Sequence, residues 1–151
     1  MDKVEVKFKR LNKKYDEIPL PSYSTEGSAG MDIRAAMDES ITLSNGEIKL
    51  VPTNLSVAIP EGYEIQVRPR SGLAVKHGIG VLNSPGTIDS DYRGEIKIIL
   101  INLGDKNFTI KPGDRIAQIV LSKFYKIKIT ETDLLEESLR GKGGFGHTGK
   151  N

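Results

Sequence analysis

Two carboxylates, Asp89 and Asp91, stand two positions apart in a short charged stretch, and Tyr92 and Arg93 follow directly. The stretch runs from residue 83 to residue 94, with turn formers on both sides and apolar runs beyond them. Paired carboxylates can act as general acid and general base where both reach the reacting atoms. The same pattern is typical of a solvated hairpin tip, so the stretch alone predicts only a charged loop between strands.

A second charged segment reads R-P-R-S-G and contains Arg70 and Ser71. It follows a predicted strand and opens a predicted short helix, whose free backbone N–H groups would favour a bound anion. The alternative is an ordinary helix start with an arginine facing solvent. A third carboxylate, Asp32, comes after a glycine-containing turn and lies between apolar residues, where it is either a functional group or a turn and capping aspartate.

The glycine-rich tail satisfies the spacing G-x-x-x-x-G-K over residues 144–150. A phosphate-binding loop of the Walker type needs Ser or Thr next and then a helix, whereas the next residue is Asn151. An ordinary P-loop is therefore not expected. The glycines could still wrap backbone N–H groups around a phosphate, and the alternative is a tail that stays flexible.

Composition excludes several kinds of chemistry. The chain has no cysteine, which excludes disulfides, thiolate catalysis and cysteine-ligated zinc, and its two histidines lie in no ligand or triad motif. Any metal would be a hard cation such as Mg²⁺, held by carboxylate and substrate phosphate oxygens. The net charge of +2 does not indicate stable nucleic-acid binding. No apolar run approaches the roughly 18 residues of a membrane span and no signal peptide opens the sequence, so a cytoplasmic protein without a membrane partner is expected.

The 151 residues fit one domain, and short segments of alternating apolar and polar residues predict that it is rich in β-strands. These segments are residues 4–8, 55–59 and 63–67, and a Pro-Glu-Gly turn joins the last two. Because 16 glycines and 7 prolines punctuate such short strands, the expected fold is all-β, a jelly-roll-like sandwich or barrel.

Other segments are less regular. Residues 96–103 and 116–121 are more continuously apolar, which favours strands buried on both faces, and Ile127 and Ile129 could end the sheet region. Helix signals are few: residues 71–76 predict one short helix, and residues 132–137 are a weaker candidate.

Five segments, in order, resemble the motifs of the trimeric deoxyuridine triphosphatase (dUTPase) family. They are A-G-M-D-I-R-A at 29–35, R-S-G-L-A-V-K-H-G-I at 70–79, N-S-P-G-T-I-D-S-D-Y-R-G-E at 83–95, G-D-R-I-A-Q at 113–118 and R-G-K-G-G-F-G-H-T-G at 140–149. A single glycine-rich segment would carry little weight. Five ordered matches over nearly the whole chain are specific.

The resemblance implies hydrolysis of dUTP to dUMP and pyrophosphate, which limits uracil in DNA and supplies dUMP for thymidylate synthesis. It also implies a homotrimer of jelly-roll subunits with shared active sites. By position, Asp89 matches the carboxylate that activates the water attacking the α-phosphorus. Asp32 matches the aspartate that contacts Mg²⁺ through water. Asp91 and Arg93 match no catalytic position, and structural pairing is expected for them.

Substrate contacts are implied for four further sets of residues. Those on the phosphate side are Arg70, Ser71, Gly72 and Gln118. Those at uracil and deoxyribose are Asn83, Thr87, Ile88 and Lys97. Tyr92 matches an aromatic residue that packs on deoxyribose and leaves no room for a 2′-hydroxyl. Those of a closing arm are Arg140, Phe145, Gly146, His147 and Thr148, with Phe145 stacked on uracil.

The implied organisation is a β domain over residues 1–139 and a flexible glycine-rich arm over residues 140–151, which closes an active site. Two other functions stay open. One is a dCTP deaminase, a family that shares the fold. Its members carry the motif R-S-S and, on a later strand, a glutamate; this chain has Gly72 in place of the second serine and Ile99 in place of the glutamate. The second is a non-catalytic jelly-roll binding module, against which the presence of Asp89, Tyr92 and the arm motif argues.

Overall fold

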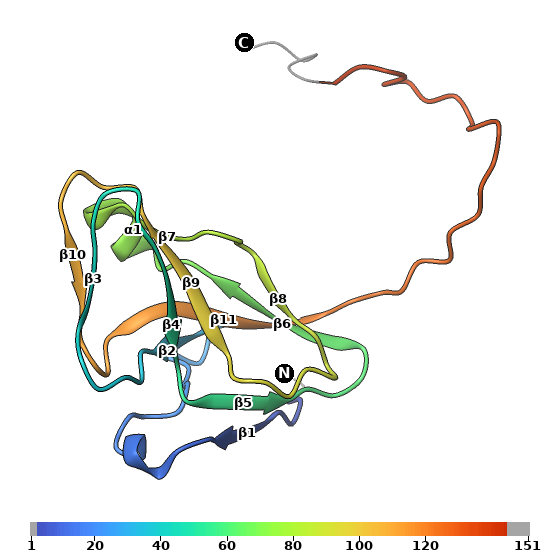
Figure 1. The fold of residues 1–151 in the computed structure, drawn as a ribbon. Helices are drawn as coiled ribbons and strands as arrows, with labels where there is room; N and C mark the ends of the chain where they lie inside the picture. Colours follow the sequence, from blue (N-terminus) through green and yellow to red (C-terminus); the bar gives the residue numbers. More distant parts are fainter. Residues whose placement is uncertain (1–2, 145–151) are drawn as a thin grey trace.

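The structure is a computed structural model that describes residues 3–144, and β-strands make up nearly all of its regular elements (Figure 1). In chain order these elements are β1 (Lys7–Arg10), the 3-10 helix η1 (Lys13–Tyr15), β2 (Gly30–Arg34), β3 (Ile41–Leu43), β4 (Ile48–Pro52), β5 (Leu55–Ala58), β6 (Tyr63–Arg68), α1 (Ser71–His77), β7 (Ile79–Val81), β8 (Gly86–Ile88), β9 (Lys97–Asn102), β10 (Phe108–Ile110) and β11 (Arg115–Lys123). The expectation of an all-β fold with one short α-helix is confirmed.

The strands form four antiparallel sheets that do not close into one barrel. The largest has the order β2-β11-β6-β8, and a second has the order β4-β9-β7. The pairs β1–β5 and β3–β10 complete the set. Each described strand lies in a different sheet from the strand that follows it in the chain, which is the crossing pattern of jelly-roll architectures.

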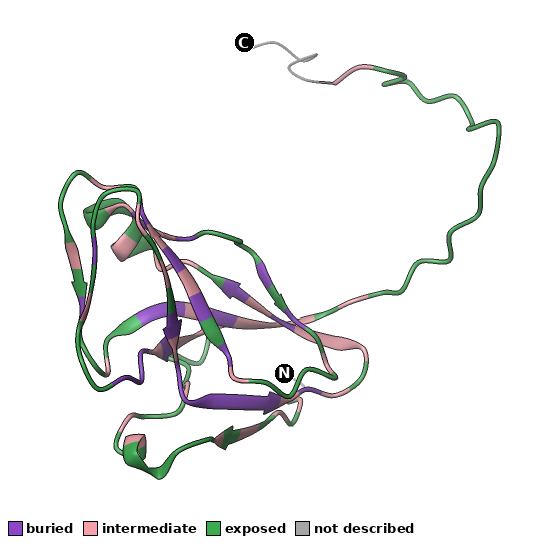
Figure 2. Cartoon of the chain, in the orientation of Figure 1, coloured by how far each residue is buried: buried purple, intermediate pink, exposed green. Residues whose placement is uncertain are grey.

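One cluster of buried side chains holds the sheets together. The first sheet contributes Ile33 on β2, Ile65 on β6 and Ile119 on β11 to this cluster. The second sheet contributes Val51 on β4 and Leu100 on β9. Figure 2 shows the buried residues concentrated on these strands, while the long C-terminal segment is exposed.

The turn predicted at residues 60–62 is present, but it does not make a hairpin. Tyr63 N–H donates to the Pro60 carbonyl (3.2 Å), and Gly62 has a φ of 85°, which favours glycine. The strands on either side do not pair with each other, because β5 pairs with β1 and β6 pairs with β11 and β8. The turn therefore carries the chain from one sheet to another.

The expectation that residues 96–103 are buried on both faces is wrong for the isolated chain. Along β9, Ile98, Leu100 and Asn102 are buried, whereas Ile99 and Ile101 are only partly buried. Their cross-strand partners on β4, Leu50 and Ile48, are 56% and 50% exposed. The outer face of the β4-β9-β7 sheet is thus apolar and open to solvent.

Residues 124–144 contain no helix or strand, so the expectations of a terminal strand at Ile127 and Ile129 and a helix at 132–137 are wrong. Phe124 N–H donates to the carbonyl of Gly62 in the turn before β6, and the segment then runs away from the body of the molecule (Figure 1). A strand needs a neighbour for its backbone groups, and a short isolated helix is marginal in water. No helix in the described residues is long and apolar enough to cross a membrane.

Asn102 offers a test of the core, because it is a polar side chain that is completely buried. Its amide nitrogen donates to the carbonyls of Leu43 (2.9 Å) and Lys106 (2.8 Å), and its oxygen accepts from Gly104 N–H (2.9 Å). Asn102→Ala leaves these backbone groups without partners, and we expect the free energy of unfolding to fall by about 2–3 kcal/mol. Urea unfolding at fixed protein concentration measures this, with the exposed Asn107→Ala as control. Equal midpoints for the two variants would contradict it.

Candidate active site

A pocket with a volume of about 370 Å³ opens between β8 and β9. Five residues for which sequence predicts nucleoside contacts line it together, although they come from four separate parts of the chain: Asn83 precedes β8, Thr87 and Ile88 lie on β8, Tyr92 lies in the following loop and Lys97 begins β9. Apolar walls come from Leu50, Val67 and Ile98 among others. A small apolar cavity with a few polar groups is the usual form of a ligand site.

One wall of the pocket carries free backbone groups. Within residues 3–144, β8 is the edge strand of its sheet and pairs only with β6. Its other edge therefore presents N–H and C=O groups that no strand uses. Gly86, Thr87 and Ile88 all line the pocket, so these backbone groups lie where a planar polar ring could pair with them.

The loop between β8 and β9 is held by its own hydrogen bonds. Tyr92 O–H donates to the Glu95 carbonyl (3.0 Å), and Tyr92 N–H donates to the Asp89 carbonyl (3.2 Å). Arg93 donates to the carbonyls of Ser90 (2.7 Å) and Tyr92 (2.9 Å). Gly94 is needed here, since a Cβ at that position would lie 2.6 Å from Tyr92 Cζ. Arg93 thus bonds to carbonyls of its own loop rather than to Asp91, and the structural pairing expected for these two residues stays a prediction.

Asp89 lies beside this pocket but does not line it. Its side chain is exposed and borders a second, open groove of about 680 Å³ together with Glu61, Asp91 and Phe124. The carboxylate is therefore accessible to water.

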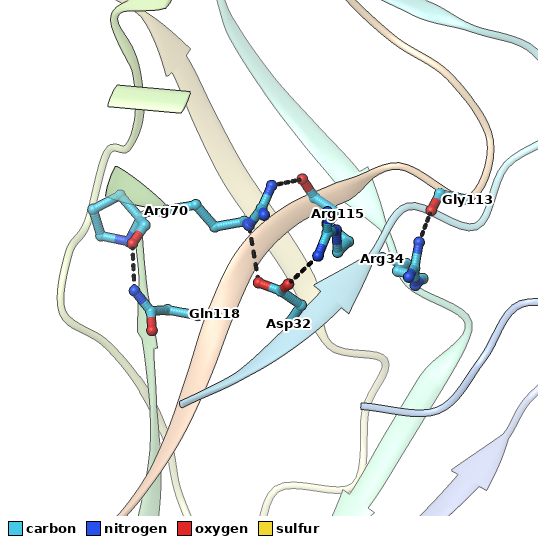
Figure 3. A network of polar contacts seen from close by, with 7 residues as sticks. Asp32, Arg34, Arg70, Gly113, Arg115 and Gln118 are labelled. Carbon is cyan, nitrogen blue, oxygen red and sulfur yellow. Dashed lines mark hydrogen bonds and ion pairs between the residues drawn. The ribbon is translucent and has the colours of Figure 1, made fainter. Parts of the chain in front are cut away.

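A cluster of polar side chains occupies another part of the molecule (Figure 3). Asp32, on β2, accepts at Oδ1 from Arg70 Nε (2.9 Å) and at Oδ2 from Arg115 Nη1 (3.1 Å). Arg70 Nη1 also donates to the Arg115 carbonyl (3.2 Å). The Asp32 and Arg70 side chains are about one quarter exposed, and that of Arg115 is 49% exposed. Two guanidinium groups and one carboxylate leave a net positive, solvent-accessible site that suits an anion.

Sheet register and a short helix position this cluster. Gln118 on β11 lies opposite Asp32 on one side and Arg68 on the other. Its amide nitrogen donates to the Pro69 carbonyl (2.9 Å), which ties β11 to the segment that leads into α1. Arg70 is the N-cap of α1, and Ser71 and Gly72 are exposed in the first helical turn. A side chain at Gly30 would collide with the Gln118 amide, so glycine keeps that amide in place.

The pocket and the cluster share no residue. By register, Asp89 lies at the level of Glu64 on β6, four residues before Arg68. At about 3.3 Å per residue this is roughly 13 Å along the strand, with Arg70 two residues further on. In one chain, Asp89 and the guanidinium groups are therefore well apart.

Comparison with known proteins agrees with these motifs. The family model for dUTPase matches residues 16–149. The chain belongs to the dUTPase family. A deoxyuridine 5'-triphosphate nucleotidohydrolase of Fusobacterium nucleatum is 59% identical over 150 residues, which cover 99% of this chain and 100% of the relative.

Solved dUTPase structures have the same fold. The D95E mutant of the dUTPase of phage 80alpha superposes with a TM-score of 0.83 at 26% identity and covers 95% of this chain and 98% of the phage chain. A G164S mutant of the Staphylococcus bacteriophage 80alpha dUTPase with dUpNHpp gives a TM-score of 0.81 at 26% identity, covering 96% and 98%.

The dUTPase motifs thus fall into three places. Residues of the third motif gather around the pocket, and those of the first, second and fourth gather in the cluster. Arg140, in the fifth motif, lies in the exposed tail, where its Nε donates to the Gly143 carbonyl (2.8 Å). Phe145, Gly146, His147 and Thr148 lie outside the described residues.

Sequence reasoning missed Arg115. It lies inside the fourth motif, but only the structure shows its side chain on Asp32. Nothing in the spacing of G-D-R-I-A-Q distinguishes an arginine that faces Asp32 from one that faces solvent.

Proposed function

We propose that this member of the dUTPase family hydrolyses dUTP to dUMP and pyrophosphate. The observation that carries the proposal is the pocket between β8 and β9, which gathers Asn83, Thr87, Ile88, Tyr92 and Lys97. The Fusobacterium nucleatum relative, which is 59% identical to this chain, is named for this activity. The solved phage 80alpha relative contains the nucleotide dUpNHpp. A dCTP deaminase is not favoured. The position that would carry the glutamate needed for proton transfer in deamination is Ile99, which lines the pocket and has no titratable group.

The free edge of β8 would recognise the base. Uracil and cytosine carry opposite donor and acceptor groups at two adjacent ring positions, and fixed backbone groups can match only one pattern. Cytosine would leave buried polar groups unpaired, a mismatch that can discriminate by roughly four orders of magnitude. Tyr92, held by Glu95, would pack on deoxyribose and exclude a 2′-hydroxyl.

Asp89 would act as the general base. Its exposed carboxylate can hold a water molecule, take its proton and direct the oxygen to the α-phosphorus. The P–O bond to the β-phosphate breaks, and pyrophosphate leaves with the electron pair. Arg70, with Ser71, Gly72 and Gln118 beside it, would bind the phosphates, since a guanidinium matches phosphate geometry.

The residues present fit Mg²⁺ that is held mainly by the substrate. In the described part of the chain no group of three or more His, Cys, Asp or Glu side chains could hold a metal ion. Asp32 is the one carboxylate of the cluster and both its oxygens already accept from guanidinium groups, which suits contact through water rather than direct ligation. The bound ion would neutralise charge on the triphosphate.

A complete site would need more than one chain, which we propose to be a homotrimer with shared active sites. Asp89 and Arg70 are far apart in one chain by their strand register. The open face of the β4-β9-β7 sheet is apolar, and two of its residues, Leu50 and Ile99, also line the pocket. An apolar patch of this kind is typical of a protein interface. A second copy that covers it would lie next to the nucleoside.

The tail supports the same arrangement. From Phe124 it leads away from its own sheets (Figure 1), and Tyr125, Ile127 and Ile129 are more than four-fifths exposed. We propose that residues 140–151 close a site on another subunit, with Arg140 at the phosphates and Phe145 at uracil.

Asp89→Asn tests the general base. The amide cannot take a proton, so we expect nucleotide binding to persist while kcat falls about 10²–10⁴-fold. Pyrophosphate release from dUTP measures kcat, and calorimetric titration with dUMP measures binding. Asp91→Asn is the matched control, because it removes a charge from the same exposed loop. If Asp89→Asn turned over dUTP as fast as Asp91→Asn, the assignment would be wrong.

Gly94→Ala tests the role of Tyr92 without changing that residue. The added methyl would overlap the Tyr92 ring and displace it. Gly27→Ala is the control, because a methyl group at that position would have no other atom within 4 Å. We expect KM for dUTP to rise about tenfold and the preference for dUTP over UTP to narrow. Steady-state rates with both nucleotides measure this. A preference equal to that of Gly27→Ala would rule out sugar selection by the ring.

A further inference from the structure

Arg115 has no assigned task in the proposed reaction, yet among the described residues it is one of only two side chains that hydrogen-bond to the Asp32 carboxylate. Its Nη1 donates to Asp32 Oδ2, and Arg70 Nε donates to Oδ1 (Figure 3). Both oxygens are therefore fixed, each by a different guanidinium. A carboxylate held at both oxygens has a defined plane, and that plane decides where a hydrogen-bonded water can sit.

A β-bulge places Arg115 there. Gln118 pairs with Asp32 and Ala117 with Ile33, but Arg115 rather than Ile116 pairs with Arg34. Ile116 is the extra residue, and both Ile116 and Ala117 point into the core, at 2% and 0% exposure. In a regular strand, residues 115 and 117 would share the inner face. The bulge turns Arg115 to the outer face, beside Asp32, as bulges next to functional sites often do.

Arg115 also supports Arg70, but through its backbone. Its carbonyl accepts from Arg70 Nη1, while its side chain bonds to Asp32. Arg70 thus has Nε and Nη1 occupied, which leaves Nη2 without a bond in the described residues and available to a phosphate. A substitution at position 115 removes the side-chain contact with Asp32 and keeps the backbone contact with Arg70.

We propose that Arg115 is a positioning residue that orients the Asp32 carboxylate toward the water shell of the nucleotide-bound Mg²⁺. The inference rests on the proposed function, which places Asp32 at that ion. It predicts that Arg115 contributes to the gain in nucleotide affinity that Mg²⁺ provides and that this contribution requires Asp32. A phosphate-binding arginine would instead contribute with or without the ion.

The experiment measures the Kd of α,β-imido-dUTP by calorimetry in Mg²⁺ and in EDTA. The ratio of the two values is the magnesium enhancement. We expect Arg115→Ala to lower this enhancement about tenfold, as loss of a group that orients a metal-side ligand does. We expect Asp32→Asn to abolish it and the double variant to show no further loss, because Arg115 acts through Asp32.

Arg68→Ala is the control for charge. Arg68 lies opposite Gln118 on the same sheet, and it bonds to Gln66 Oε1 rather than to Asp32. We expect this variant to keep the wild-type enhancement. Thermal unfolding of each variant shows that it is folded, and if Arg115→Ala does not fold, Arg115→Gln takes its place.

Three results would overturn the inference. They are a folded Arg115 variant with the wild-type enhancement, an equal loss of affinity in Mg²⁺ and in EDTA, and a further loss when Arg115→Ala is added to Asp32→Asn. The measurements on the wild-type protein distinguish a failure of this inference from a failure of the proposed function. If the wild-type protein neither hydrolyses dUTP nor gains affinity from Mg²⁺, the proposed function itself fails.

Discussion

The antiparallel pairing of β11 with β2 on one side and β6 on the other is the constraint on which the polar cluster depends. This register sets Gln118 opposite both Asp32 and Arg68. From Arg68 the chain passes through Pro69, which accepts from Gln118, to Arg70 at the start of α1. Three segments that are remote in sequence are thereby fixed to one another by main-chain ladders. A one-residue slip of β11 would turn Gln118 into the core and dismantle the cluster.

The pocket depends on the opposite arrangement, two strands that do not pair. β8 belongs to the sheet of β6, and β9 belongs to the sheet of β4 and β7. Had β8 and β9 formed a hairpin, each would have used the backbone edge of the other. Because they lie in different sheets, a cavity remains between them, and the loop that carries Asp89 and Tyr92 spans its rim.

Local chemistry in the sequence was sufficient for some of this structure. Alternation at residues 55–59 and 63–67 predicted β5 and β6, and residues 71–76 predicted α1, which ends where Gly78 adopts a φ of 68°. The pairing of these strands could not be predicted, since β5 and β6 are adjacent in the chain and bond elsewhere. Arg115 was missed for the same reason, because its direction depends on a bulge that alternation does not reveal. The apolar run at residues 96–103 predicted burial on both faces, but Ile99 is only partly buried in the single chain, and the strand expected at Ile127 and Ile129 is absent from it.

The proposed division of one catalytic site between chains has a direct test in hybrid assemblies. The variants Asp89→Asn and Arg70→Ala are each expected to be inactive alone. For the test, the two proteins are mixed in equal amounts, unfolded and refolded together. If the subunits form random cyclic trimers, three quarters are mixed and each mixed trimer has one site in three with both residues intact, so about a quarter of wild-type activity should return. Different affinity tags on the two variants confirm that hybrids form. Tagged hybrids that hydrolyse dUTP no faster than the parent variants would contradict a shared site.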